Sequence, residues 1–385
     1  MCKAFLSLLV LVLLSGHTQA ADWSAQALAD AKQDRVVLAY DGIKPDSMVC
    51  DTTVRELADG SWMLLILAGD SREPSPSNYV GVARSADQGK TWSKLEAFDT
   101  GLPRAGDTQG QGPTELIVTD KEALLFFATH GETFSWAKRW QSWLLRGTPD
   151  GKSWGKPELL PGRLGHYCFI RSHIVTRDGR LIVPFQHYLR SPKDSTTSYG
   201  EDRRLCDPRN GVMISGDGGK TWTEHGNIRL TDDPLYFGWA EPSIVELADG
   251  TLKMVIRADR LGGVLYAAES KDGGKTWPEQ AVKTDIPNPG SKATLYSLGG
   301  DTVALVHNPN PKHRSPLALW ISFDGMRSWP YRRTLVAESV DGPKGNINYP
   351  EGFVSKDRQW LHIAFDNNRH QACLISAKLP PLPHP

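Results

Sequence analysis

Side chains that could bind or react recur at matching places in six repeated segments of the chain. Each segment contains a short turn, and about eight residues before that turn stand Asp51, Arg171, Glu241, Ser291 and Tyr349, with Glu115 nearest in the second segment. A second set follows the turns and comprises Asp70, His130, His187, Arg257, His307, Arg314, Asp366 and Arg369. Arginine holds a carboxylate through paired hydrogen bonds, and two carboxyl groups can do acid–base chemistry at a glycosidic bond. The residue types therefore suit a pocket for an acidic or heavily hydroxylated ligand.

These residues would have to be positioned by β-hairpins, because an apolar strand precedes and follows each turn. Six such hairpins are expected, at residues 54–67, 115–128, 173–186, 243–257, 294–307 and 352–365. A second turn follows most of them. Its octapeptide reads SADQGKTW at 85–92, and related versions occur at 147–154, 215–222, 270–277 and 322–329. Asp and Gly favour a tight turn, because Gly accepts a positive φ and Asp bonds its own backbone.

Six hairpins and five octapeptides, spaced roughly 50–70 residues apart, predict an all-β fold: a six-bladed β-propeller of four-stranded antiparallel blades. A β-sandwich with coincidental turns is the alternative. Because strand direction alternates within a blade, both kinds of turn lie on one face, and the candidate residues surround the axis on the other. We therefore expect the octapeptides to be scaffold. The alternative role for each candidate residue is to cap a strand end and pair with a neighbour.

Composition and the N-terminal residues indicate an exported protein. The chain has 385 residues with 44 Lys plus Arg and 44 Asp plus Glu, so no net charge would recruit nucleic acid. Residues 1–20 combine one Lys, an apolar run and small residues at the end, which predicts a signal peptide followed by a single propeller domain at 21–385. The apolar run is too short to span a membrane. We expect a secreted or periplasmic protein without a membrane span.

The cysteines do not predict a metal site. Cys50, Cys168, Cys206 and Cys373 are irregularly spaced, with no CxxC pair and no histidine at metal-ligand spacing. Export would permit disulfides, but the sequence leaves their pairing open, and buried free thiols are an equal alternative. We therefore expect no metal and no other cofactor.

The octapeptides resemble the Asp-box, or BNR, repeats of the sialidase superfamily, and EPSIVELADGTLKMVIR and RSPLALWISFDGMRSW resemble its fourth and fifth blades. The resemblance covers most of the chain. It implies an exported glycoside hydrolase, similar to an exo-α-sialidase, that removes a terminal sialic acid or related acidic sugar from a glycan. By the same resemblance, Tyr349 matches the nucleophile and Glu241 the base that takes its proton. Asp70 matches the acid/base, and Arg257 and Arg314 match two arginines of a three-arginine carboxylate clamp.

The first blade departs from the pattern of that superfamily. An Arg-Ile-Pro motif is replaced by CDTTV, so that Cys50 or Asp51 stands where the first clamp arginine belongs. Glu73 is a second choice for the acid/base, and Arg72 is a conceivable replacement for the missing arginine. A modified pocket is therefore expected. Its further lining residues are predicted to be Asp51, Arg171, His187, His307, Asp366 and Arg369.

Two other functions stay open at this point. One is a propeller hydrolase or lyase that acts on polysaccharides containing uronic acid or rhamnose. The other is a non-catalytic glycan-binding propeller, in which Tyr349 and tryptophan side chains stack on sugar rings. In each case the partner is a glycan, and we expect the protein to act as a monomer.

Overall fold

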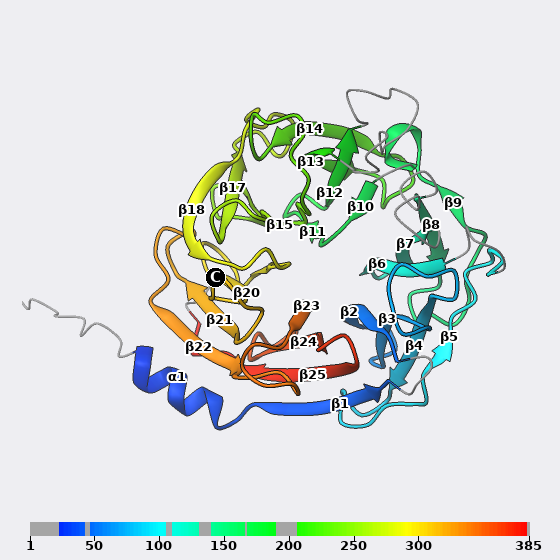
Figure 1. Ribbon diagram of the computed structural model, residues 1–385, viewed down its shortest axis with the longest axis horizontal. Coiled ribbons are helices and arrows are strands. Elements are labelled where there is room, and N and C mark those ends of the chain that lie inside the picture. Colours follow the sequence, from blue (N-terminus) through cyan, green and yellow to red (C-terminus); the bar gives the residue numbers. More distant parts are fainter. Residues whose placement is uncertain are drawn as a thin grey trace, which may run out of the picture.

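Six β-sheets are arranged like blades around a central axis (Figure 1). The computed structural model describes residues 23–42, 47–104, 110–130, 140–165, 168–189 and 206–382. The signal peptide predicted for residues 1–20 lies outside the described residues. The arrangement confirms the predicted six-bladed propeller and excludes the sandwich.

Each blade has four main strands in antiparallel order, numbered here from the axis outward. Blade 1 contains β2 (Val49–Glu56), β3 (Trp62–Ala68), β4 (Tyr79–Ser85) and β5 (Glu96–Ala97), and blade 2 contains β6 (Gly110–Val118), β7 (Ala123–His130), β8 (Gln141–Gly147) and β9 (Glu158–Leu159). Blade 3 contains β10 (Cys168–Ile170), the short β11 (Ile174–Val175), β12 (Leu181–Leu189), β13 (Cys206–Ser215) and β14 (Thr223–Arg229). Blade 4 contains β15 (Pro242–Glu246), β16 (Leu252–Ile256), β17 (Val264–Ser270) and β18 (Val282–Pro287).

Blades 5 and 6 complete the ring. Blade 5 contains β19 (Thr294–Ser297), β20 (Val303–His307), β21 (Leu317–Ser322) and β22 (Tyr331–Val336), and blade 6 contains β23 (Ile347–Val354), β24 (Trp360–Asn367), β25 (Gln371–Lys378) and β1 (Arg35–Asp41). Strand β1 pairs antiparallel with β25, from Arg35 opposite Ser376 to Asp41 opposite Gln371. The last blade therefore takes its outermost strand from the N-terminal part of the chain, which joins the two ends of the ring by backbone hydrogen bonds.

The α-helix α1 (Trp23–Ala31) precedes this closing strand and packs against blade 5 (Figure 1), and a short 3-10 helix, η2 (Gly162–Gly165), follows β9. Trp23 stacks on Phe323 with 4.4 Å between ring centroids, and the Tyr331 hydroxyl donates to the Asp30 carboxylate at 2.9 Å. No helix among the described residues is long and apolar enough to cross a lipid bilayer.

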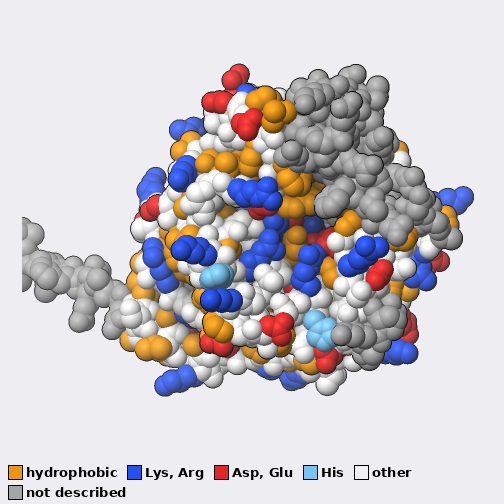
Figure 2. All heavy atoms as spheres, in the orientation of Figure 1, with side chains coloured by type: hydrophobic (Ala, Val, Ile, Leu, Met, Phe, Trp, Pro, Cys, Tyr) orange, Lys and Arg blue, Asp and Glu red, His pale blue; other side chains and the backbone are white. Residues whose placement is uncertain are grey.

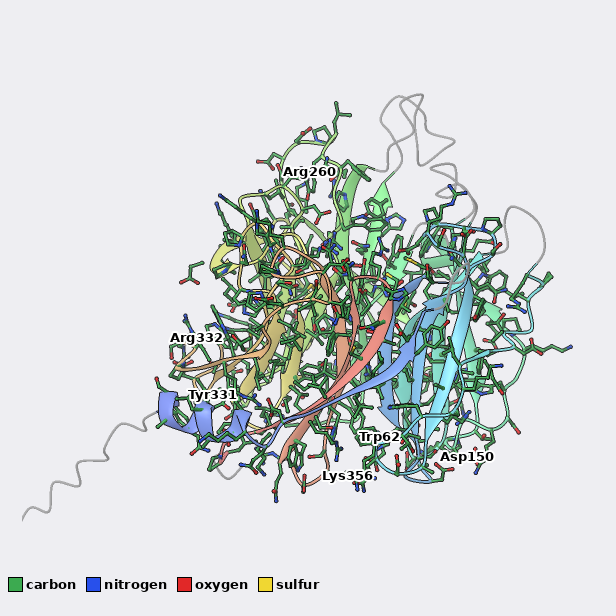
Figure 3. The ribbon with its side chains drawn as sticks, turned by 60° about the horizontal axis from the view of Figure 1, so that its bottom comes forward. Trp62, Asp150, Arg260, Tyr331, Arg332 and Lys356 are labelled. Carbon is green, nitrogen blue, oxygen red and sulfur yellow. The ribbon has the colours of Figure 1, made fainter. Side chains whose placement is uncertain are left out.

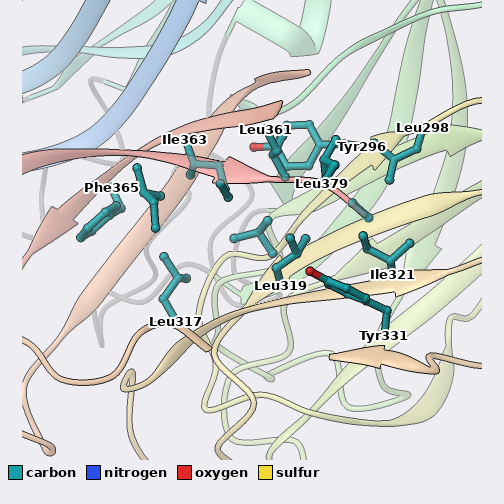
Figure 4. Close-up of a cluster of buried hydrophobic side chains, with 14 of the residues drawn as sticks. Tyr296, Leu298, Leu317, Leu319, Ile321, Tyr331, Leu361, Ile363, Phe365 and Leu379 are labelled. Atoms are coloured by element: carbon teal, nitrogen blue, oxygen red, sulfur yellow. The ribbon is translucent and has the colours of Figure 1, made fainter. Parts of the chain in front are cut away.

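The apolar core lies between neighbouring blades. Because each inner strand faces a blade on either side, both of its faces are buried, and β3 buries all seven of its residues. Figure 4 shows the cluster between blades 5 and 6, to which β21 contributes Leu317, Leu319 and Ile321 and β24 contributes Leu361 and Ile363. Cys50 and Cys373 are buried free thiols, so for these two the free-thiol alternative holds.

The five octapeptides form the turns between the third and fourth strands of blades 1 to 5, as predicted. In blade 3, the Asp217 carboxylate accepts hydrogen bonds from the amides of Lys220 and Thr221 and from the hydroxyls of Ser215 and Thr221. These hydrogen bonds hold the pKa of Asp217 below its usual range. Figure 3 shows Asp150, from the second octapeptide, and Arg260, which follows β16, at opposite ends of the molecule. The octapeptides are therefore scaffold, remote from the face described next.

Candidate active site

Two bulged strands bring Asp51 and Tyr349 to the axis. The pairing of β2 with β3 shifts between Cys50 and Thr53, and the pairing of β23 with β24 shifts between Asn348 and Glu351. Asp51 and Tyr349 occupy these bulges with φ values of 49° and 50°, in the left-handed region that non-glycine residues rarely adopt. A bulge turns a side chain away from the regular alternation of the strand. The neighbouring Thr52 hydroxyl donates to the Tyr349 carbonyl at 2.9 Å, so the two bulges are joined.

The ring of Tyr349 packs among apolar side chains, and charged groups of both signs surround its phenol. Its ring packs on Met48, Cys50 and Leu67, and the guanidinium carbon of Arg171 lies 5.4 Å from the ring centroid. Burial raises the pKa of the Tyr349 phenol well above its usual value of 10, and Glu241 is the charged group that raises it most. A phenol in this setting stays protonated unless a base removes its proton during reaction.

Glu241 is held as a carboxylate by two arginines. It directly precedes β15 and is 2% exposed. Its Oε2 accepts from Arg257 Nη1 at 2.8 Å, and its Oε1 lies 3.6 Å from Arg171 Nη2. Burial acts to raise the pKa of Glu241, but Arg257 and Arg171 outweigh it and hold the pKa below its usual range. Arg257 is in turn paired with Asp259, at 2.8 and 3.1 Å.

Arg171 also binds the carboxyl group of Asp51. Its Nη2 donates to Asp51 Oδ1 at 2.9 Å, and both side chains are at least nine-tenths buried. Burial raises the pKa of Asp51 to about 7, although Arg171 opposes the shift. Asp51 therefore holds a proton at a pH at which an ordinary aspartate is ionised.

Asn348 and Asp366 hold two further arginines beside Tyr349. Arg314 Nη1 donates to Asn348 Oδ1 at 2.8 Å, and Asn348 Nδ2 donates to Asp366 Oδ1 at 2.7 Å. The amide of Arg369 donates to the same Asp366 oxygen at 2.9 Å, while its guanidinium binds Cys50 Sγ at 3.3 Å and the Glu73 carboxylate. Burial raises the pKa of Asp366 to about 6. Arg369 therefore reaches the position where Cys50 stands.

The face of the propeller that carries Tyr349 has a hollow at the axis, with basic and acidic side chains gathered around it (Figure 2).

Residues 107–363 match the family model described as BNR repeat-like domain. The match covers more than half of the chain. The protein belongs to the BNR repeat-like domain family.

One relative of this BNR repeat-like propeller is a sialidase. A sialidase of Bacteroides fragilis is 30% identical over 333 residues, which are 78% of this chain and 56% of that protein. The chain thus spans only about half the length of the relative.

Solved structures share the fold at low sequence identity. A protein of unknown function from Dyadobacter fermentans has a TM-score of 0.67 at 18% identity, with 90% of this chain and 99% of that chain covered. The Hadza microbial sialidase Hz136 has a TM-score of 0.65 at 21% identity, with 86% of this chain and 66% of that chain covered. A Trypanosoma rangeli sialidase in complex with the inhibitor DANA has a TM-score of 0.64 at 18% identity, with 89% of this chain and 59% of that chain covered. Likeness at this level shows the propeller fold.

For three residues predicted for the site of this BNR repeat-like domain, the contacts described are not with the cluster around Tyr349. Asp70 organises the loop that follows β3, since its carboxylate accepts from the Ser71 amide at 2.5 Å and from the Ser75 hydroxyl. The ring of His307 meets Trp320 edge-on at 4.6 Å inside blade 5, and burial lowers the pKa of His307 to about 3. His187 is buried in β12, opposite Cys168 and Arg209.

Several partners in the site were missed from the sequence. Asp259 stands two residues after Arg257, and an i, i+2 spacing in extended chain was an available signal for pairing. Asn348 directly precedes Tyr349, but nothing in the sequence pointed to its contacts with Arg314 and Asp366. The contact of Arg369 with Cys50 joins residues 319 positions apart, which no local pattern could reveal.

One group of potential metal-ligating side chains occurs among the described residues: Cys50, Asp51 and Glu73, with one ligand atom of each within 4.8 Å of the others. Arg171 binds Asp51, and Arg369 binds Cys50 and Glu73. Guanidinium groups therefore already supply the positive charge to this group, and we do not assign it as a metal site.

Proposed function

We propose that the protein is a glycoside hydrolase that removes a terminal acidic sugar, sialic acid or a relative, from a glycan. Tyr349 is the nucleophile and Glu241 is its base. The observation that carries the proposal is the environment of Glu241: two arginines hold its pKa below the usual range, and among charged groups it acts most strongly on the Tyr349 phenol. An ionised carboxylate beside a protonated phenol is the pair that a tyrosine nucleophile needs.

The reaction is a double displacement. The Tyr349 oxygen bonds to the anomeric carbon as its proton passes to Glu241, and the bond from that carbon to the glycosidic oxygen breaks. The electron pair goes to the leaving oxygen, which takes a proton from a general acid. Water then bonds to the anomeric carbon and gives one proton to the deprotonated general acid, the phenolate leaves, and Glu241 returns the proton to Tyr349. Two displacements retain the configuration at the anomeric carbon.

The acidic group of the sugar would be bound by arginine. Arg257 and Arg314 both act electrostatically on Tyr349. Arg257 is neutralised by Glu241 and Asp259, whereas among the described residues Arg314 donates only to neutral oxygens, those of Asn348 and Gly290. We therefore assign the main carboxylate contact to Arg314. The relationship to the Bacteroides fragilis sialidase supports an acidic sugar as substrate.

The test is release of 4-methylumbelliferone from its sialic acid conjugate by the purified protein, beside Tyr349→Phe. Turnover by the wild type and none by the variant is expected. The variant should still bind the free acidic sugar, which calorimetry would measure. Turnover that survives in Tyr349→Phe would contradict the assigned nucleophile.

A uronic-acid or rhamnose-containing polysaccharide is a second candidate substrate. The observation in its favour is that Arg369 binds Cys50, in the segment where the sialidase resemblance expects a clamp arginine and this chain has Cys50 or Asp51. Conjugates of glucuronic acid and rhamnose, assayed beside the sialic acid conjugate, would separate the two candidates.

A further inference from the structure

The carboxyl group of Asp51 lies within the cluster around Tyr349, next to a bond that links their strands. Thr52, the next residue, binds the Tyr349 carbonyl at 2.9 Å. Arg171 joins the side chains, because its Nη2 binds Asp51 Oδ1 at 2.9 Å while its guanidinium lies over the Tyr349 ring. The same nitrogen lies 3.6 Å from Glu241. Asp51, Glu241 and Tyr349 therefore surround one guanidinium group.

Asp51 has a free oxygen, whereas Asp70 has none. Only Oδ1 of Asp51 receives a hydrogen bond from the described residues, so Oδ2 is available to a ligand. Both oxygens of Asp70 accept hydrogen bonds, Oδ1 from the Ser71 amide and Oδ2 from the Ser75 hydroxyl. These bonds hold the pKa of Asp70 below its usual range, so it lacks a proton to give at neutral pH.

Charged and titratable groups from four blades face Asp51; burial, Glu73 and Glu241 raise its pKa, whereas Arg171 and Arg369 lower it. The facing groups are Cys50 and Glu73 from blade 1, Arg171 from blade 3, Glu241 from blade 4, and Tyr349 and Arg369 from blade 6. The pKa of Asp51 is raised to about 7, while that of Glu241 is lowered. Two carboxyl groups with pKa values moved apart in one site suit opposite tasks, one as acid and one as base.

We propose that Asp51, rather than Asp70, is the general acid and base of the reaction. This role rests on the proposed glycosidase function. In the first displacement, the Asp51 proton passes to the glycosidic oxygen as its bond to the anomeric carbon breaks. In the second, the Asp51 carboxylate takes a proton from the attacking water, whose oxygen bonds to the anomeric carbon while the bond to Tyr349 breaks. Asp51 ends protonated, as it began.

The leaving group decides whether a general acid is needed, and this gives the test. A phenol such as 4-methylumbelliferone leaves without protonation, whereas the sugar hydroxyl released from sialyllactose must be protonated. Asp51→Asn should therefore lower kcat/KM on sialyllactose by ~10²- to 10⁴-fold, the range for general acid catalysis, and on the umbelliferyl conjugate by far less. Asp70→Asn should affect both substrates by the same factor.

An unequal loss in Asp70→Asn with an equal loss in Asp51→Asn would overturn the assignment. Asp249→Asn, in an exposed turn on the opposite face, controls for a generic effect of the substitution. If Asp51→Asn does not fold, Asp51→Glu keeps a partner for Arg171 and displaces the carboxyl group, and the same ratio is measured. If the wild type turns over neither substrate, nor any other acidic-sugar conjugate, the proposed glycosidase function itself is contradicted.

A second measurement follows the protonation of the Asp51 carboxyl group directly. Carbon-13 NMR of aspartate side-chain carboxyls should show one signal that titrates near the pKa of about 7 and is missing from Asp51→Asn. Titration of that signal in the ordinary aspartate range would overturn the role of Asp51 as an acid, whatever the substrate.

Discussion

The four arginines around Tyr349 differ in how far their charge is already balanced. Arg171, Arg257 and Arg369 each contact at least one carboxylate. In the part of the chain that the structure describes, Arg314 donates only to neutral oxygens. A ligand carboxylate gains most from a guanidinium that is not already neutralised, because it need not compete with a protein carboxylate. The acidic group of the substrate should therefore depend on Arg314 more than on its neighbours.

Replacing Arg314 by Met should raise KM for the acidic sugar by ~10- to 100-fold, since a hydrogen bond to a charged group contributes about 1.5–3 kcal/mol. The kcat should change less, because the contact exists in both ground and transition states. Steady-state kinetics and calorimetry with the free sugar would measure both effects. Arg177→Met, a largely exposed arginine on the opposite face, is the matched control. An unchanged KM in Arg314→Met would contradict the assigned contact.

Asp51 should make the stability of the protein fall with rising pH. Its pKa is raised by folding from 3.8 to about 7, so between these values the folded state binds a proton that the unfolded state has released. This lowers the free energy of unfolding by up to about 1.4 kcal/mol per pH unit, and the effect ends above the folded pKa. Asp51→Asn lacks this term, so its stability relative to the wild type should improve from pH 4 to pH 7. Parallel pH curves in urea unfolding would contradict the pKa assigned to Asp51.

At the scale of the element, the octapeptide turn is held by one aspartate. Asp217 accepts four hydrogen bonds between 2.6 and 3.0 Å, all within its own turn. Asp150, in the divergent octapeptide of blade 2, accepts from the Thr148 hydroxyl and the Lys152 amide. The number of amides held in place therefore differs between otherwise equivalent turns.

Asp217→Ala should lower the free energy of unfolding by roughly 1–3 kcal/mol, because backbone donors lose their acceptor. Asp150→Ala should lower the free energy of unfolding by less. Neither change should alter KM, since both turns lie on the face away from Tyr349. Urea titration monitored by tryptophan fluorescence would measure the difference. Equal losses in the two variants would mean that the extra hydrogen bonds of Asp217 contribute nothing.

The bulges at Asp51 and Tyr349 could not be predicted from the sequence. The hairpin turns and strand lengths follow from apolar runs and Asp/Gly pairs, which are local signals. A left-handed φ at Asp51 or Tyr349 has no such signal, because only a small minority of non-glycine residues adopt it, even for aspartate, which is enriched there. Counting back from the turns gave the positions of Asp51, Arg171, Glu241 and Tyr349 around the axis, but not the side-chain contacts that join them.

At the scale of the whole molecule, a buried ionic network ties blades together at the axis. Glu351 of blade 6 accepts from Arg55 of blade 1 at 2.9 Å and from Lys292, just before blade 5, at 2.6 Å. Arg55 also binds Glu115 of blade 2 at 2.5 Å. A cavity of about 860 Å³ opens beside this network on the octapeptide face, away from Tyr349. The network therefore joins blades that meet where the ring closes.

Glu351→Gln should destabilise the protein by about 3–5 kcal/mol, because two buried cations lose a charged partner. The matched control is Lys356→Gln, which removes an exposed ion pair with Glu56 between the same two blades and should cost less than about 1 kcal/mol. Thermal unfolding of the two variants would test this. Similar losses in both would show that the axial network does not stabilise the ring.

The sequence by itself determined the repeat, the number of blades, the scaffold role of the octapeptides and the face on which Tyr349 and Glu241 lie. These follow from periodicity and turn chemistry, which neighbouring residues encode. Only the tertiary structure decided that β1 completes the last blade, that Arg171 pairs with Asp51, and that Arg369 reaches Cys50. The pairing of β1 lies at the outer edge of blade 6 and the two arginine contacts lie near the axis, and all three join residues more than a hundred positions apart. Their geometry depends on how six blades close into a ring, which no local pattern specifies.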